Sequence, residues 1–225
     1  MLGVKVLGLA VSQVAEISTP RIGPSPHPRG RPDTPHRQSV GRCRRYAGGV
    51  PRPSAGEADP TENFKRFALE LYACDGVSPA CLHLQDRFDL DVNLVLFAAY
   101  VGAVQRQSMT PAGLEVAKRG VDDWHREVVR SLRAVRRRLK TGPTPAPNDE
   151  TTRLRRKVQQ AEIDAEMIEL GQLGAVLPQL NLPAAGGSGV DCATAAIETV
   201  VRAYSAATLQ PDDRRAIRTV ASAAT

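Results

Sequence analysis

The segment LVLFAAYVGAV, residues 94–104, is apolar at nearly every position and constrains the fold more than any other part of the chain. A helix with this composition has no polar face to turn toward water, so other elements must cover its whole circumference. It is also too short to cross a membrane, which takes about 20 apolar residues, and no longer apolar run exists in the sequence. The segment therefore predicts the central helix of a small helical bundle, with no membrane span.

Helix start signals surround this segment. Asp59-Pro60, Ser78-Pro79 and Thr110-Pro111 each place a side-chain oxygen directly before a proline. This order suits a helix start, because the oxygen caps a free backbone N–H and a proline in the first turn has no N–H to leave unpaired. Asp91 supplies a fourth cap, and its carboxylate suits the positive end of a helix. The four helices predicted in this way cover about 60–73, 79–88, 92–106 and 111–139.

The helix after Thr110 shows one long apolar stripe, and a bend or restart is expected near Gly120. Residues on one face of a helix recur every three or four positions, so the stripe should form a continuous buried seam. Its members are Val121, Trp124, Val128, Leu132, Val135 and Leu139.

A second long helix is predicted at about 151–177, after a Pro-rich linker at 141–150. Its apolar residues repeat with heptad spacing and charges fill its other faces, so the narrow seam needs a partner helix. The partner is either the bundle or another copy of the protein. Two weaker, Ala-rich helices should follow at about 190–207 and 211–223. The heptad residues are Leu154, Val158, Ala161, Ala165 and Ile168.

The N-terminal segment has a different composition. Residues 1–60 hold nine of the 17 prolines and nine Lys or Arg against four Asp or Glu, which is +5 of the net charge of +6. Such a segment buries too little apolar surface to fold, so we expect a disordered tail. The fold class is thus all-α, a helical bundle with a long heptad-patterned helix. The expected organisation is a disordered basic Pro/Arg-rich tail at 1–59, a four-helix core at 60–140, a linker at 141–150, and the long helix with its weaker successors at 151–225.

Two blocks of sequence, FALELYACDGVSPACLHLQDRFDLDVNLVLFAAYVGA and WHREVVRSLRAVRRRLK, resemble a family of small proteobacterial proteins known only as conserved hypothetical, with a domain of unknown function. The resemblance extends over about 64–208. It implies a compact, wholly helical, cytoplasmic protein and no particular activity. The chain has Asp89 where the family has Gly and Tyr100 where it has Trp.

Polar residues interrupt the apolar faces of two predicted helices. Gln85 and Asn93 both point inward by helical count, and an unpaired buried amide costs roughly 1 to 3 kcal/mol. We therefore predict a buried amide pair that fixes the register of the two helices, with Trp124 as an alternative partner. The other interpretation is a small-molecule pocket. Its lining would be Gln85, Asp86, Asn93, Tyr100 and Trp124.

Four arginines, Arg126, Arg130, Arg133 and Arg137, form a basic stripe on the helix after Thr110. A charge run on a helix is usually solvated or internally paired, and cations are favoured near a helix C-terminus. The alternative is an anion-binding face that acts with the basic tail on nucleic acid or an anionic surface. That binding would be weak and sensitive to salt.

The sequence offers no catalytic constellation. It lacks the common phosphate-binding, nucleotide-binding, metalloprotease and serine-hydrolase motifs. His83 and His125 have no paired nucleophile, and Cys81 with His83 has no second ligand pair for a metal. We therefore expect no enzyme, no catalytic residue, no metal and no cofactor.

The function that fits these features best is a non-enzymatic cytoplasmic accessory or protein-interaction module. Residues 151–177 are the expected contact surface, either for a protein partner or for self-association. Binding of nucleic acid or an anionic surface through the arginine stripe and the tail is the alternative. A small-molecule pocket near Gln85 and Asn93 is the third possibility.

Overall fold

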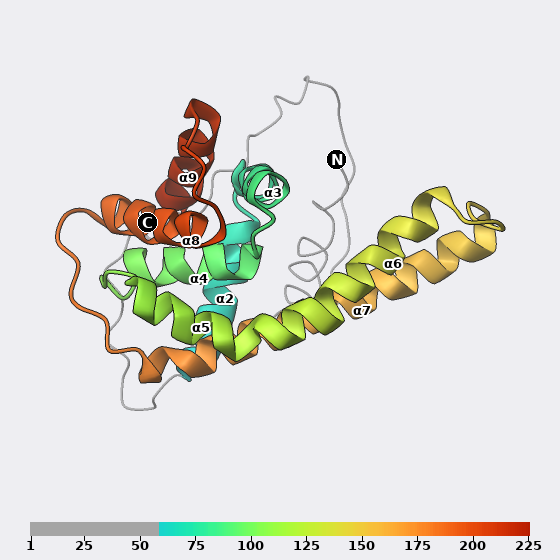
Figure 1. Ribbon diagram of the computed structural model, residues 1–225. Coiled ribbons are helices and arrows are strands. Elements are labelled where there is room, and N and C mark those ends of the chain that lie inside the picture. Colours follow the sequence, from blue (N-terminus) through green and yellow to red (C-terminus); the bar gives the residue numbers. More distant parts are fainter. Residues whose placement is uncertain (1–58) are drawn as a thin grey trace, which may run out of the picture.

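The computed structural model describes residues 59–225, and Figure 1 shows that they form an assembly of helices. Within this range strand pairing is limited to one isolated bridge between Gln107 and Ala184, so the predicted all-α fold is confirmed. Apart from Asp59, the tail predicted at 1–59 lies outside the described residues. None of the described helices is long and apolar enough to cross a membrane.

The elements follow one another without a change of class. They are α2 (Pro60–Tyr72), α3 (Val77–Phe88), α4 (Val92–Ala103), α5 (Pro111–Trp124), the π-helical turn η2 (His125–Val129), α6 (Arg130–Thr141), α7 (Asp149–Val176), the 3-10 turn η3 (Leu177–Gln179), α8 (Gly189–Tyr204) and α9 (Pro211–Ala223).

Three of the four predicted helix caps are confirmed. The start predicted at Ser78 is wrong, because α3 begins at Val77 and its N-cap is Gly76. Gly76 has a φ of 82°, a left-handed conformation that glycine adopts readily because it has no Cβ. The confirmed caps are Asp59, Asp91 and Thr110, whose side chains accept hydrogen bonds from the backbone N–H groups of Thr61, Asn93 and Gly113.

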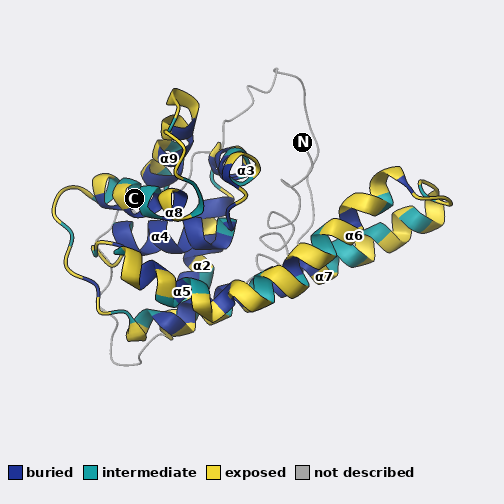
Figure 2. Cartoon of the chain, viewed as in Figure 1, coloured by how far each residue is buried: buried dark blue, intermediate teal, exposed yellow. Residues whose placement is uncertain are grey.

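The body of the protein consists of α2–α5, the second half of α7, α8 and α9. Helix α4 lies at its centre, as predicted, and Figure 2 shows it coloured mostly as buried. Helices α2, α3, α7, α8 and α9 all contact it. The ring of Phe97 meets that of Phe64 on α2 nearly at a right angle with 5.4 Å between centroids, and Tyr100 packs 5.1 Å from Phe67. Edge-to-face aromatic pairs of this kind stabilise a core beyond the area they bury.

The core does not divide at the predicted linker. One cluster of buried apolar side chains runs from Phe64 to Ala221, and α8 packs along α4. The helices predicted at 60–140 and the segment 151–225 therefore share one core. Helix α4 has too much apolar surface for α2 and α3 alone to cover, and α7, α8 and α9 cover the rest.

Helix α6 and the first half of α7 form an antiparallel arm that projects from the body (Figure 1). At 28 residues α7 spans about 42 Å at 1.5 Å per residue. The connection is shorter than the predicted linker, because α6 continues to Thr141 and α7 begins at Asp149. Asn148 and Thr151 form a reciprocal capping box that fixes the start of α7.

A buried carboxylate joins the two outermost helices of the body. Asp213, in the first turn of α9, has a side chain that is 1% exposed. Its Oδ2 accepts hydrogen bonds from Arg87 Nε and the Gln210 backbone N–H, each at 2.8 Å, and its Oδ1 lies 2.8 Å from His83 Nε2. Burial acts to raise the pKa of Asp213, but the hydrogen bonds from Gln210, His83 and Arg87 outweigh it and hold the pKa below its usual value.

The approach of α4 to α8 depends on Gly102. A Cβ at this position would lie 2.6 Å from backbone atoms of Ala193. Gly102→Ala is therefore expected to lower the free energy of unfolding by about 2 kcal/mol, as other overpacked cores do. Gly186→Ala is the control, because nothing lies within 4 Å of its added Cβ. Denaturant unfolding of both variants measures the difference, and equal stability would contradict the close approach.

Asp213→Asn is expected to lower the free energy of unfolding by about 2 kcal/mol at neutral pH, because it removes charge-assisted hydrogen bonds. The folded pKa lies below the ordinary 3.8, so this stabilisation is fully present above that pH and is lost as the pH falls through the folded pKa. Urea unfolding at pH 5 and at pH 3 should show the gap between wild type and variant shrinking. A gap of constant size would argue against the assignment.

Candidate functional site

A π-helical turn interrupts the helix that the sequence predicts after Thr110. Residues His125–Val129 form η2 between α5 and α6, whereas the bend was predicted near Gly120. A π turn takes one residue more than an α turn, so every later side chain moves on by one position around the helix. Val135 of the predicted seam is consequently 48% exposed, and Arg136 beside it is 4% exposed. The continuous apolar seam is thus wrong beyond the turn.

The face of α7 that packs on α6 and the body carries carboxylates. Glu162, Glu166 and Glu169 are 1%, 8% and 0% exposed, and their spacing places them on one helical face. The heptad seam predicted for this helix is largely wrong, since Leu154 and Ile168 are 49% and 50% exposed. Buried charges of this kind need partners, because an isolated one costs several kcal/mol.

Two arginines of α6 supply the partners for the first two carboxylates. Arg133 donates from Nε to Glu162 Oε1 at 3.1 Å and from Nη2 to Glu166 Oε1 at 2.9 Å. Arg136 donates from Nη2 to Glu162 Oε1 at 3.1 Å, and its Nε donates to the other oxygen of the same carboxylate. The pairs fix the register of the arm, because each guanidinium meets its carboxylate in only one alignment of the two helices.

The electrostatics of this network follow from burial. Burial acts to lower the pKa of Arg133, but the carboxylates of Glu166 and Glu162 outweigh it and raise the pKa. Burial is also the largest influence on Glu166 and raises its pKa to about 7, against the opposing charge of Arg133.

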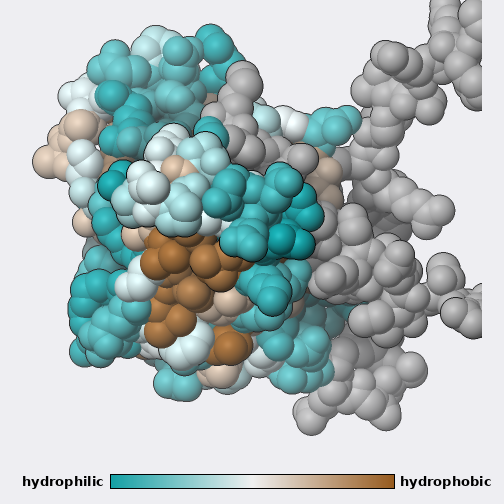
Figure 3. Space-filling view, turned by 90° about the vertical axis from the view of Figure 1, so that its right-hand side faces the viewer, coloured by the Kyte–Doolittle hydropathy of each residue, from teal (hydrophilic) through white to brown (hydrophobic). Residues whose placement is uncertain are grey.

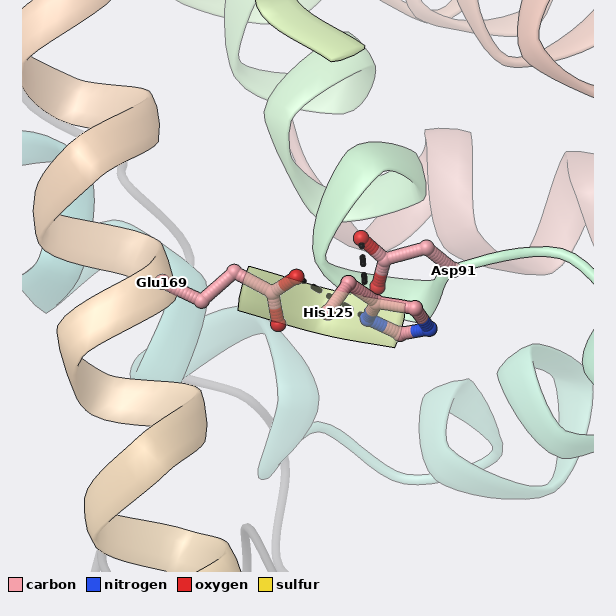
Figure 4. A group of neighbouring side chains, drawn as sticks. All are labelled: Asp91, His125 and Glu169. Atoms are coloured by element: carbon pink, nitrogen blue, oxygen red, sulfur yellow. Dashed lines mark hydrogen bonds and ion pairs between the residues drawn. The ribbon is translucent and has the colours of Figure 1, made fainter. Parts of the chain in front are cut away.

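The third carboxylate, Glu169, meets Asp91 and His125 at the root of the arm (Figure 4). Asp91 caps α4 and His125 is the first residue of the π turn. His125 Nδ1 is hydrogen bonded to Glu169 Oε1 at 2.9 Å and lies 3.6 Å from Asp91 Oδ2. The side chains of Asp91, His125 and Glu169 are 4%, 14% and 0% exposed, so the three groups meet in a nearly closed interior.

Asn93 holds both carboxylates of this cluster. Its backbone N–H donates to Asp91 Oδ1 at 2.8 Å, and its side-chain Nδ2 donates to Glu169 Oε2 at 2.7 Å. One oxygen of each carboxylate is thereby occupied, and the other, Asp91 Oδ2 or Glu169 Oε1, faces His125. The buried amide therefore orients a cluster of charged groups, and the predicted pair of Asn93 with Gln85 is wrong.

The cluster shifts the pKa of its members. Burial, followed by the charge of Glu169, raises the pKa of Asp91 to about 7. Burial acts to lower the pKa of His125, but the hydrogen bond to Glu169 and the charge of Asp91 outweigh it and raise the pKa.

The structure does not bring the five residues of the predicted pocket together. Gln85 is half-buried and Asp86 exposed on α3, while Tyr100 packs on α2 at the opposite end of α4 from Asn93. Trp124, like Asn93, is hydrogen bonded to α7: its Nε1 donates to the Ala165 carbonyl at 3.0 Å.

The predicted arginine stripe is mostly neutralised within the protein. Arg126 pairs with Asp123 and Glu127, and Arg130 donates to Asp89 Oδ2 at 3.1 Å. Arg133 belongs to the buried network, and among residues 59–225 only Arg137 of the four has no ion pair. The internally paired interpretation of the stripe therefore describes three of its members.

Sequence reasoning missed His125 and the three glutamates of α7 as site residues. The spacing of Glu162, Glu166 and Glu169 is a visible signal, since it puts three carboxylates on one face of a helix. His125 carries a signal of the same kind, because it lies four residues after Val121 and eleven after Leu114, both buried on α5, so helical spacing places it on the inward face.

Residues 63–173 match the model of the family described as Protein of unknown function (DUF2390). The match confirms the resemblance expected from the sequence and contains Asp91, His125 and Glu169, although it ends before the predicted residue 208. The proteobacterial origin stays a prediction. No curated protein and no solved structure matches the chain. The family description names no activity.

Arg136→Met is expected to lower the free energy of unfolding by about 3 kcal/mol, because Glu162 then loses a partner inside the protein. Arg137→Met is the matched control. Arg137 is exposed and has no ion pair among the described residues, so the expected change is below about 0.5 kcal/mol. Denaturant unfolding compares the two variants, and similar losses for both would contradict the buried pair.

Proposed function

We propose that the protein is a non-enzymatic accessory module whose α6–α7 arm binds an acidic, amphipathic partner protein. The observation that carries the proposal is the outer half of the arm, where unpaired cations lie beside half-exposed aliphatic side chains. The cytoplasmic location is part of the proposal and follows from the family resemblance alone.

The cations of the outer arm outnumber their acidic neighbours. Residues 137–157 contain seven Lys or Arg against two Asp or Glu, a balance of +5. Six of the seven are exposed and make no ion pair with any residue in 59–225, in contrast to Arg133 and Arg136 nearer the body. A surface of this kind attracts an acidic partner and speeds its association. The six are Arg137, Arg138, Lys140, Arg153, Arg156 and Lys157.

Aliphatic side chains accompany these cations. Leu154 is exposed among them, and Ala161 and Ile168, also exposed, continue the same face of α7 toward the body at heptad spacing. Figure 3 looks onto the end of the arm and shows hydrophobic side chains gathered beside hydrophilic ones. An amphipathic helix that carries both apolar and acidic residues would satisfy this surface.

The same features favour a partner protein over nucleic acid or a second copy of the chain. Nucleic acid gains affinity from bases stacked on aromatic rings, and residues 130–168 include no Phe, Tyr or Trp. Two copies of the arm laid together would bring like charges into contact, which costs free energy. The charge therefore argues against self-association in which the two outer arms, residues 137–157, lie against each other.

The polar interior supports a non-enzymatic role. The buried arginines of α6 form ion pairs with the glutamates of α7. The residues that would line a small-molecule pocket near Gln85 and Asn93 lie apart, and Asn93 donates to Glu169. A catalytic group has to reach a substrate, and these groups are turned toward each other.

A photo-crosslinking amino acid in place of Leu154, in the full chain inside its native cells, tests the proposal. We expect an adduct with a different protein, at a segment rich in Asp and Glu. Arg153→Glu with Arg156→Glu should remove most of it, because the variant reverses two of the unpaired charges. The same crosslinker at Arg218, exposed on α9, is the control position.

Three outcomes contradict the proposal. A nuclease-sensitive adduct supports the nucleic-acid alternative, and an adduct between two copies of the chain supports self-association. Equal adducts at positions 154 and 218 show that the arm has no specific partner.

A further inference from the structure

We propose that Asp91, His125 and Glu169 bind a divalent transition-metal ion through Oδ2, Nδ1 and Oε1. The inference is independent of the partner proposed for the arm. It assigns a ligand to the one cluster among residues 59–225 in which three potential ligand groups from separate elements converge.

The spacing of the three atoms suits a metal ion. All lie within 4.8 Å of one another, with His125 Nδ1 at 2.9 Å from Glu169 Oε1 and 3.6 Å from Asp91 Oδ2. Ligands bound at about 2.1 Å lie about 3.0 Å apart at adjacent octahedral positions and about 3.4 Å apart in a tetrahedron. The two distances from His125 therefore differ from these spacings by at most about 0.6 Å, and the two carboxylate oxygens lie within 4.8 Å of each other.

A buried oxygen without a hydrogen-bond donor points into the cluster. Asp91 Oδ2 is buried and has no hydrogen-bond donor, although the side chain is 4% exposed. Buried carboxylate oxygens normally have donors, so an exception calls for an explanation. A cation between Oδ2 and His125 would supply the missing interaction.

Asn93 acts as the supporting residue that such a site requires. Metal-binding carboxylates are commonly held by hydrogen bonds to their second oxygen. Asn93 donates to Asp91 Oδ1 and to Glu169 Oε2, which leaves Oδ2 and Oε1 for the ion. One residue thus orients two ligands that come from different helices.

The donor set indicates the class of metal. One imidazole and two carboxylates without a thiolate suit Zn²⁺, Mn²⁺ or Fe²⁺ better than Cu⁺. A divalent ion would also match the two negative charges that Asp91 and Glu169 bring into the interior. Bound there, it would join the start of α4, the π turn and α7, and so fix the root of the arm to the body.

Titration of the metal-free full chain with Zn²⁺ and with Co²⁺ tests the inference. Trp124, the only tryptophan, precedes His125 and bonds to α7 at Ala165, so its fluorescence reports on this site. We expect quenching by Co²⁺ that saturates at about one equivalent, with a dissociation constant in the micromolar range or below, and a higher Tm with Zn²⁺.

Three variants separate this site from other ligands in the chain. His125→Gln should weaken binding at least 100-fold, because it removes a ligand. Asn93→Leu should weaken binding about 10- to 100-fold, because it frees the Glu169 carboxylate, while the backbone N–H of residue 93 still donates to Asp91. His83→Gln should bind as the wild type does, since His83 lies in the middle of α3 and is hydrogen bonded to Asp213 on α9.

The outcomes decide the inference without relying on a variant that fails to fold. Wild-type protein that shows no saturable binding of Zn²⁺ or Co²⁺ overturns it. So does binding that survives in His125→Gln, because the ion would then sit on other residues.

Discussion

The arrangement of the arm depends on the need of three buried carboxylates on α7 for polar partners. Each of Glu162, Glu166 and Glu169 would be costly inside a protein without a partner. Arg133 and Arg136 form ion pairs with the first two of these glutamates. Glu169 is hydrogen bonded to His125 and Asn93. A buried ion pair adds little stability compared with apolar packing, but it selects one alignment of two helices. The register of the arm against the body follows from that selection.

The π turn makes this arrangement possible. In an unbroken α-helix Val128, Leu132 and Val135 would face α7, and the glutamates would meet aliphatic side chains. With the extra residue at His125–Val129, Val135 lies outside and Arg136 lies inside, while Leu132 and Arg133 are both half-buried. His125, at the start of the turn, contacts Asp91 and Glu169. Such turns occur frequently at functional sites, where a local change of pitch places a side chain that the α pitch would turn away. The irregular turn and the charged interface therefore require each other.

Different interactions stabilise the body and the arm. In the body, an apolar helix is covered by its neighbours, so hydrophobic burial and ring packing hold it together. In the arm, polar pairs align two helices whose outer surfaces stay exposed. The contrast explains why Leu154 and Ile168 remain on the surface, since the inward face of α7 is already taken by charged side chains.

Local chemistry in the sequence determined the helical class, three capped helix starts at Asp59, Asp91 and Thr110, and the central place of α4. These features depend on hydrogen bonds within a few residues or on the composition of one segment. Only the tertiary structure decided which faces of α6 and α7 turn inward, because a charged side chain is buried or exposed according to the partner it meets. Asn93 illustrates the division, since its inward direction follows from helical spacing and its partner, Glu169, is 76 residues away.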